Sequence, residues 1–268
     1  MKFLFLTAAL VLSFSTAARD LPSWESLEFE QKAFWVTAHA SLHLASAGGK
    51  PQRWQLTAIS SVANNMEQRT VEFESDSGRV IERERLSRGK NQRLKQYAYT
   101  DTGVLRLRKE PEDGATPGDD WSVTSRRELA IPDTALDNPL VDSYALLVLA
   151  AEAIDSEKPV RFSVHTDFNF YTVEVLAGKV ESVQLARQLH SGETKLDGVR
   201  QARAVTLRAS GLPGNPDKAD FSLLGLGAEI TILYDIDTGL PLQLRGRAPR
   251  IGNAELNLIN MQLRATSS

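Results

Sequence analysis

Two histidines four residues apart, His39 and His43, are the first pair whose type and spacing could bind a metal. On a helix such a pair can hold zinc, but on a strand, at ~3.3 Å per residue, the two side chains lie about 13 Å apart. From Phe34 to Leu44 every even position is apolar, which is the alternation of a strand. The zinc-protease motif also needs a glutamate directly after His39, which this chain lacks. We therefore predict no metal site here.

A second candidate is the segment from Asp235 to Gly239, whose Asp-Ile-Asp-Thr-Gly order is similar to the start of a calcium loop. Such a loop needs a third oxygen ligand where Gly239 stands and a glycine where Leu240 stands. It also needs a bidentate glutamate at its twelfth position, which Gly246 occupies. The segment therefore predicts a strand that ends in an Asp-Thr-Gly turn.

Other catalytic patterns are missing from the sequence. No serine lies in a G-x-S-x-G elbow, and Gly225 and Gly227 lack the spacing and the lysine of a phosphate loop. The chain has no cysteine, which excludes thiol catalysis and cysteine-bound metals. We predict no catalytic residue, no metal ligand and no cofactor, and we do not expect an enzyme.

Four aromatic residues are the best candidates for binding. Tyr97 and Tyr99 share a strand face with two basic residues, and Phe168 and Phe170 share a face of a later strand. Such residues could line a pocket for an acidic amphiphile, with its apolar tail inside and its headgroup at the rim. The alternative is a filled core with aromatic residues at its boundary. We predict Tyr97, Tyr99, Phe168 and Phe170 as ligand contacts.

Strands must position these residues, because period-two alternation recurs between glycine, proline and aspartate turns. The predicted strands cover residues 34–44, 53–59, 69–74, 80–86, 93–99, 104–109, 160–165, 168–177, 180–189, 202–208, 229–236, 242–247 and 254–263. Hairpin turns are predicted at 75–78, 101–103, 177–179 and 237–239. Opposite charges on both faces of 82–85 predict a sheet edge, and a change of parity near Leu258 predicts a β-bulge.

Two segments interrupt the strands. Residues 110–120 are rich in acid, proline and glycine, which predicts a surface loop. Residues 139–154 begin with a proline and are apolar nearly all round, which predicts a buried helix. We therefore predict a single mostly β domain over residues 19–268. Its fold class is an antiparallel curved sheet, a barrel or half-barrel, with one buried central helix at about 139–154.

The first residues predict export. Lys2 is followed by a mostly apolar run from Phe3 to Phe14 and by small residues up to Ala18, which indicates a cleavable signal peptide over residues 1–18. The run is shorter than the roughly 20 apolar residues of a spanning helix. Without a cysteine to acylate, a lipoprotein anchor is excluded. We expect a periplasmic protein whose mature chain has no transmembrane segment. The net charge of −3, with dispersed arginines, argues against nucleic acid as a partner.

The order of several short motifs resembles an exported bacterial family, domain of unknown function 3108. The motifs are Tyr97-Ala98-Tyr99, NPLVDSYALL at 138–147, FYTVEV at 170–175, LDGV at 196–199 and, most specifically, YDIDTGLPLQL at 234–244 with Ile251-Gly252 after it. The family usually has a longer, arginine-ended helix where this chain continues into Ala150–Ala153. The resemblance implies a secreted, curved or barrel-like β-sheet protein. It implies no agreed activity and supplies no catalytic residue.

Three functional classes stay open. We favour a binder or carrier of a hydrophobic or amphiphilic ligand, which requires a cavity of several hundred Å³. The alternative is an envelope assembly or interaction protein that pairs with a protein partner through its sheet edges, and that class requires a filled interior and an uncovered edge. A hydrolase of unknown class is the third, and it requires titratable residues clustered in a cleft.

Overall fold

The computed structural model describes residues 21–33, 36–50, 52–89, 92–112, 121–156, 158–215, 219–249 and 251–265. The predicted signal peptide lies outside these ranges, as do residues 113–120 of the predicted loop. None of the helices in the described ranges has the length and apolar character needed to cross a membrane.

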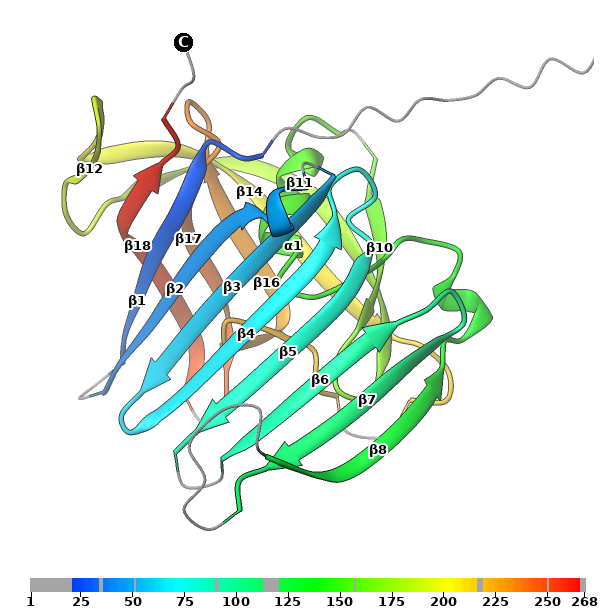
Figure 1. Cartoon of the computed structure of the whole chain (residues 1–268). Coiled ribbons are helices and arrows are strands. Elements are labelled where there is room, and N and C mark those ends of the chain that lie inside the picture. Colours follow the sequence, from blue (N-terminus) through cyan, green and yellow to red (C-terminus); the bar gives the residue numbers. More distant parts are fainter. Residues whose placement is uncertain are drawn as a thin grey trace, which may run out of the picture.

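One large sheet of sixteen strands dominates the molecule (Figure 1). Its first half comprises β1 (Trp24–Ala33), β2 (Val36–Ser46), β3 (Arg53–Val62), β4 (Asn65–Glu74), β5 (Val80–Arg88), β6 (Arg93–Tyr99), β7 (Gly103–Glu110) and β8 (Ser122–Ala130). Its second half comprises β9 (Leu140–Val141), β10 (Val160–His165), β11 (Phe170–Gln184), β14 (Val199–Gly211), β15 (Ser222–Leu223), β16 (Leu226–Asp235), β17 (Pro241–Ala248) and β18 (Gly252–Leu263). A separate hairpin joins β12 (Leu189–Ser191) to β13 (Thr194–Leu196).

The hydrogen-bonded order of the large sheet is β8-β7-β6-β5-β4-β3-β2-β1-β18-β17-β16-β14-β11-β10-β9, with β15 beside β16. The pairing of β9 with β10 is parallel, and the other pairs are antiparallel. The sheet curls, so that β10 and β11 lie behind β4 to β6 in Figure 1. Side chains bridge the gap, since Arg83 on β5 donates a hydrogen bond of 2.9 Å to the backbone oxygen of His165 on β10. The predicted antiparallel curved sheet is confirmed, and its strand order is open.

The core lies inside this curve because alternate residues of each strand point inward. On β2, Leu42 and Leu44 are buried, and Leu56 on β3 faces the same interior. Trp54 packs edge-on against Phe73 of β4, with 5.9 Å between the ring centroids. Each such side chain contributes roughly 1.5–3 kcal/mol of burial free energy.

The predicted buried helix is confirmed, but it is shorter than expected. Its α-helical part, α1, spans Leu146–Leu149 and continues as the 3₁₀ segment η3 (Ala150–Asp155). The predicted first turn forms β9 instead. After β9, the carboxylate of Asp142 accepts a hydrogen bond from the backbone of Tyr144 at 2.8 Å, which turns the chain before the helix begins. The hydroxyl of Tyr234 donates to the backbone oxygen of Leu147 at 3.0 Å and ties α1 to the sheet.

Two details of the strand prediction are wrong. No hairpin occurs at 177–179, because β11 runs through it with a bulge between Ala177 and Val180. A Cβ atom at Gly178 would lie 3.3 Å from the backbone oxygen of Ala204, so the glycine permits close approach of β14 instead of a turn. The charged segment 82–85 is not an edge either, since β5 pairs with both β4 and β6.

Other local predictions are confirmed. His39 and His43 lie on β2, as the alternation indicates. The β18 bulge occurs where predicted, because Glu28 pairs with Asn260 but the next residue, Phe29, pairs with Leu258. The turn after β16 is an Asp-Thr-Gly turn. The side chain of Asp235 accepts hydrogen bonds from the backbone nitrogen and the hydroxyl of Thr238, at 3.0 and 2.7 Å.

Candidate ligand-binding site

Basic side chains cover the inner face of four neighbouring strands, at positions where a β protein usually places apolar residues. They lie on β4, β5, β6 and β7, namely Arg69, Arg83, Arg85, Arg93, Lys95 and Arg106. The register brings them together, since Arg69 pairs with Arg85 across the strands and Arg85 pairs with Lys95. Cations cannot be buried in such a row without anionic partners.

Two carboxylates neutralise part of this row. Asp142, fully buried after β9, lies 2.8 Å from Nη1 of Arg83 and 3.7 Å from Nη1 of Arg69. Glu67 on β4 lies 2.6 Å from Nη2 of Arg85 and 3.7 Å from Nη2 of Arg69. Burial alone would raise the pKa of Asp142, but the two arginines hold it below the ordinary value. Asp142 is therefore ionised.

A third carboxylate, Asp167, lies in the turn between β10 and β11. It accepts hydrogen bonds from Lys95, from the hydroxyl of Tyr97 at 2.5 Å and from Nε of Arg106 at 2.7 Å. Burial opposes its ionisation, yet these three donors hold the pKa of Asp167 well below its usual range. Burial also lowers the pKa of Lys95 to about 8, against the attraction of Asp167. Lys95 is therefore the one cation of the row whose charge changes near neutral pH.

His165, at the end of β10, is buried among aromatic rings. Its Nδ1 lies 3.0 Å from the hydroxyl of Tyr99, and its ring lies 4.7 Å from that of Phe170. Burial lowers the pKa of His165 well below its ordinary value, and the nearby cations Arg83 and Arg106 lower it further. The imidazole is therefore neutral and serves as a packing and hydrogen-bonding group.

The row of cations borders a partly open cavity of about 350 Å³, here called the basic cavity. Five basic residues line it, namely Arg69, Arg83, Arg85, Arg93 and Lys95. Two carboxylates, Asp167 and Asp220, line it as well, together with the hydroxyl-bearing residues Ser143, Thr166 and Ser222 and with Tyr97. Hydroxyl groups and guanidinium groups are the donors that hold oxyanions.

A second cavity of about 370 Å³, here called the apolar cavity, opens beside the first. Its lining is mainly apolar and includes Ala38, Ala40, Val62, Leu224, Ile251 and Leu256. Arg85 and Ser222 line both cavities, so the two are neighbours at these residues. Figure 1 shows the strands of this lining, β2 and β3 in front and β17 and β18 beside them.

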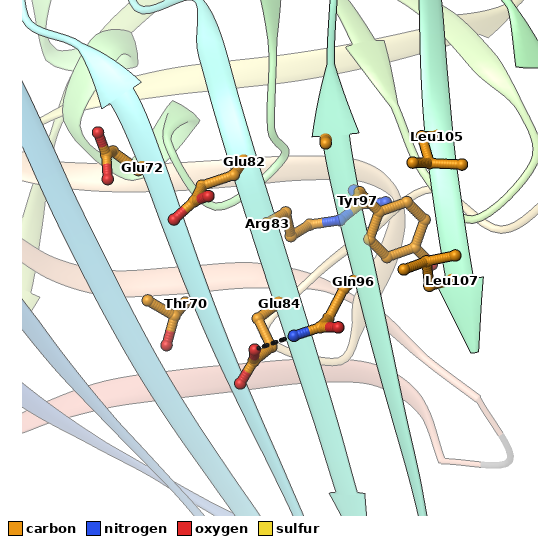
Figure 2. A pocket seen from close by; sticks show the side chains of 10 residues that line it. Thr70, Glu72, Glu82, Arg83, Glu84, Gln96, Tyr97, Leu105 and Leu107 are labelled. Atoms are coloured by element: carbon orange, nitrogen blue, oxygen red, sulfur yellow. Dashed lines mark hydrogen bonds between the residues drawn. The ribbon is translucent and has the colours of Figure 1, made fainter. Parts of the chain in front are cut away.

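A groove of about 390 Å³ lies on the opposite face of the same strands (Figure 2). Glu72, Glu82 and Glu84 form one side of it, and Leu105 and Leu107 form the other. Nε2 of Gln96 donates to Glu84 at 3.0 Å across its floor. Glu82 and Glu84 of β5 thus lie on the outer face, and Arg83 and Arg85 lie on the inner face.

The four predicted ligand contacts come together around the turn from β10 to β11. The rings of Tyr97 and Tyr99 lie 5.8 and 5.7 Å from that of His165, which Phe170 also contacts. Phe168 lies under the guanidinium group of Arg106, at 4.4 Å. Tyr97 lines the basic cavity, whereas Tyr99 borders a separate hollow near Pro139. The role of all four as ligand contacts stays a prediction.

The charges of 82–85 were read from the sequence as a sign of a sheet edge, and two basic residues were noted beside Tyr97 and Tyr99, but no charged residue was predicted as a ligand contact. Arg69 occupies the same inward parity as Val71 and Phe73, which are buried. Charged residues at inward positions of an alternating strand indicate a buried polar site, and Arg83 and Arg85 carry the same signal. Their partner Asp142 lies 59 residues from Arg83 in the sequence, and no local pattern connects the two.

Comparison of the chain with protein-family models, with curated proteins and with solved structures finds no match. The site is therefore interpreted from its own geometry.

Proposed function

We propose that this protein binds or carries a hydrophobic or amphiphilic ligand inside the curve of its sheet. One observation carries the proposal: an apolar cavity and a basic cavity adjoin at Arg85 and Ser222. Ligand sites are typically concave and mostly apolar, with a few polar groups that fix the orientation of the ligand. The neighbouring cavities offer both kinds of lining.

An apolar chain would gain its binding free energy in the apolar cavity. Each methylene group removed from water contributes about 0.8 kcal/mol, so eight such groups give roughly 6 kcal/mol before the entropy cost of binding is subtracted. The contacts of the polar end must supply the rest of the binding free energy.

The test of this function is native mass spectrometry of the purified protein, followed by organic extraction and by titration with a hydrophobic fluorescent dye. We expect a copurifying amphiphile and saturable dye binding. The substitution Ser60→Phe should fill the apolar cavity that Ser60 lines and weaken dye binding about tenfold. Thr57→Phe, on the other face of β3, is the matched control. The absence of both an amphiphile and dye binding would refute the proposal.

We further propose that the protein meets its ligand in the periplasm, after removal of residues 1–18. The support is the sequence of the signal segment, together with the resemblance to an exported family. Fractionation of cells that express the full chain and a chain lacking residues 1–18 tests it. Retention of the full chain in the cytoplasm would contradict this location.

A second candidate function, assembly with an envelope protein, is favoured by the open edge of β8. Among the described strands β8 pairs with β7, and it lies at the end of the strand order. Its Val123 is 54% exposed. An exposed edge can accept a strand from a partner. Copurification of one envelope protein that survives Ser60→Phe but is lost with Val123→Lys would favour this function over ligand carriage.

A further inference from the structure

We infer that the polar end of the ligand is an oxyanion, a phosphate or a carboxylate, held in the basic cavity while its tail occupies the apolar cavity. The inference rests on the proposed function and adds the chemical class of the ligand. It predicts that the protein selects acidic amphiphiles over neutral or cationic ones.

The first support for an anionic headgroup is the balance of charges around the basic cavity. Asp142 is shared by Arg69 and Arg83, and Asp167 is shared by Lys95 and Arg106. Glu67 is likewise shared by Arg69 and Arg85. Each of these carboxylates thus serves two cations, so the row keeps a positive excess. Such an excess at a partly open cavity attracts an anion.

The fourth carboxylate of the site, Asp220, does not neutralise this excess by direct ion pairing. It accepts hydrogen bonds from the neutral side chains of Thr166, Asn169 and Tyr171, at 2.7, 2.7 and 3.0 Å. These bonds fix the turn that carries Asp167. Asp220 therefore shapes the part of the cavity wall that this turn forms.

The second support is a set of arginine Nε atoms that lack hydrogen-bond acceptors. The Nε atoms of Arg69, Arg83, Arg85 and Arg93 are buried and have no hydrogen-bond acceptor in the described part of the chain. Buried donors are normally paired, because an unpaired one costs free energy. Arg93 goes further, since it forms no ion pair with any residue of the described ranges. An oxyanion offers several acceptors at once to such a cluster.

The third support is the position of Arg85 and Ser222 between the two cavities. Arg85 and Ser222 line both cavities, so a headgroup bound beside them lies next to the opening of the apolar cavity. Arg93 and Lys95 line the basic cavity and not the apolar one, so they are available to the headgroup and not to the tail. The arrangement fits a ligand with one charged end and one apolar chain.

The experiment compares four amphiphiles with the same twelve-carbon chain: dodecyl phosphate, dodecanoate, dodecanol and dodecyltrimethylammonium. Their affinities for the purified mature protein are measured by calorimetry below the micelle-forming concentrations. At least one of the two anions should bind about tenfold or more tightly than dodecanol, and the cation should bind most weakly. A titration with inorganic phosphate measures how much of the effect the headgroup supplies alone.

The variant Arg93→Gln isolates the headgroup contribution, because Arg93 lies outside the ion pairs that hold the fold. It should reduce the affinity for the anion by about tenfold and leave dodecanol binding unchanged. Arg85→Gln provides a second test at the junction. Arg208→Gln is the matched control, since Arg208 is exposed and pairs with Glu229 on β16. It should change neither affinity.

The outcomes separate the two levels of the proposal. If none of the four amphiphiles binds, the proposed function itself fails. If dodecanol binds as tightly as both anions, or if Arg93→Gln and Arg85→Gln leave the preference for anions unchanged, the function stands and the oxyanion inference is overturned.

Discussion

Arg83 and Asp142 form a buried ion pair, with 2.8 Å between Nη1 and Oδ2, that joins β5 to the segment entering α1. The same guanidinium group donates to the backbone oxygens of His165 and Thr166. One arginine thus links β5, the segment before the buried helix and the turn of the site. It is one of several side-chain contacts that hold the two parts of the curled sheet together, because no strand ladder joins β5 to β10 in the described part of the molecule.

Asp142→Asn should destabilise the protein by about 3–5 kcal/mol, because it leaves the buried Arg83 without its charge partner. Urea denaturation at pH 7 measures the loss. The matched control is Asp101→Asn, which removes an exposed pair with Arg79 and should cost at most about 1 kcal/mol. Equal losses of unfolding free energy in the two variants would show that the buried pair contributes no more stability than the exposed pair.

Stability should fall as the pH drops below the ordinary His165 pKa of 6.5. Above pH 6.5 the imidazole of His165 is neutral in both the folded and the unfolded protein. Below pH 6.5 the unfolded chain binds a proton at His165, whereas the folded protein does not. The free energy of unfolding should therefore decrease by up to about 1.4 kcal/mol per pH unit.

The variant His165→Asn keeps a polar atom near Tyr99 and cannot protonate. The slope of melting temperature against pH between 7 and 5 should flatten in this variant, although its stability at pH 7 will be lower. His39→Asn, on the outward side of β2, is the control and should keep the original slope. An unchanged slope in His165→Asn would assign the pH response to another group.

The affinity for dodecanoate should fall between pH 7 and pH 9. Burial lowers the pKa of Lys95 to about 8, so the free protein loses this charge on passing that pH, while the ligand stays ionised. Among the neighbouring charges, Asp167 raises the pKa of Lys95, and Arg106 and Arg85 lower it. The expected loss is about threefold to tenfold. Lys95→Arg should remove the pH dependence, and dodecanol binding should show none in either protein.

Gly78→Ala should be more destabilising than Gly239→Ala. Both glycines have a positive φ, +73° and +70°, so both substitutions introduce about 1 kcal/mol of backbone strain. At Gly78 the new Cβ would also lie 2.6 Å from Cδ1 of Leu149 on α1, whereas at Gly239 no atom lies within 4 Å. The additional cost of overpacking is about 1–3 kcal/mol. Similar melting temperatures for the two variants would show that α1 moves aside freely.

Much of the fold follows from local patterns, because inward and outward residues alternate on most strands. The pattern fails on β1, where the register with β18 shifts between Trp24 and Ser26. Trp24 and Leu27 both become buried although they are three positions apart. β8 was missed for another reason, since most of its residues are exposed and it has no apolar face to reveal it.

The site was predictable in part. The aromatic residues Tyr97 and Phe170 were predicted as ligand contacts from their strand faces, and in the structure both rings pack against His165. The ion pairs were not predicted, because Asp142 and Asp167 come from segments 59 and 72 residues from their partners Arg83 and Lys95. Residues so far apart in the sequence pair only because the sheet curls. The one sign of this pairing in the sequence is that basic residues occupy inward-facing positions of the strands.

The pairing of β1 with β18 joins the first and last strands of the described chain at the middle of the sheet. A fragment that ends before β18 therefore has two unpaired strand edges, one on β1 and one on β17. Each of these edges can pair wrongly with another chain. The ladders of β18 with β1 and β17 can form only after residues 252–263 have been synthesised, so the two halves of the sheet become one only at the end of synthesis.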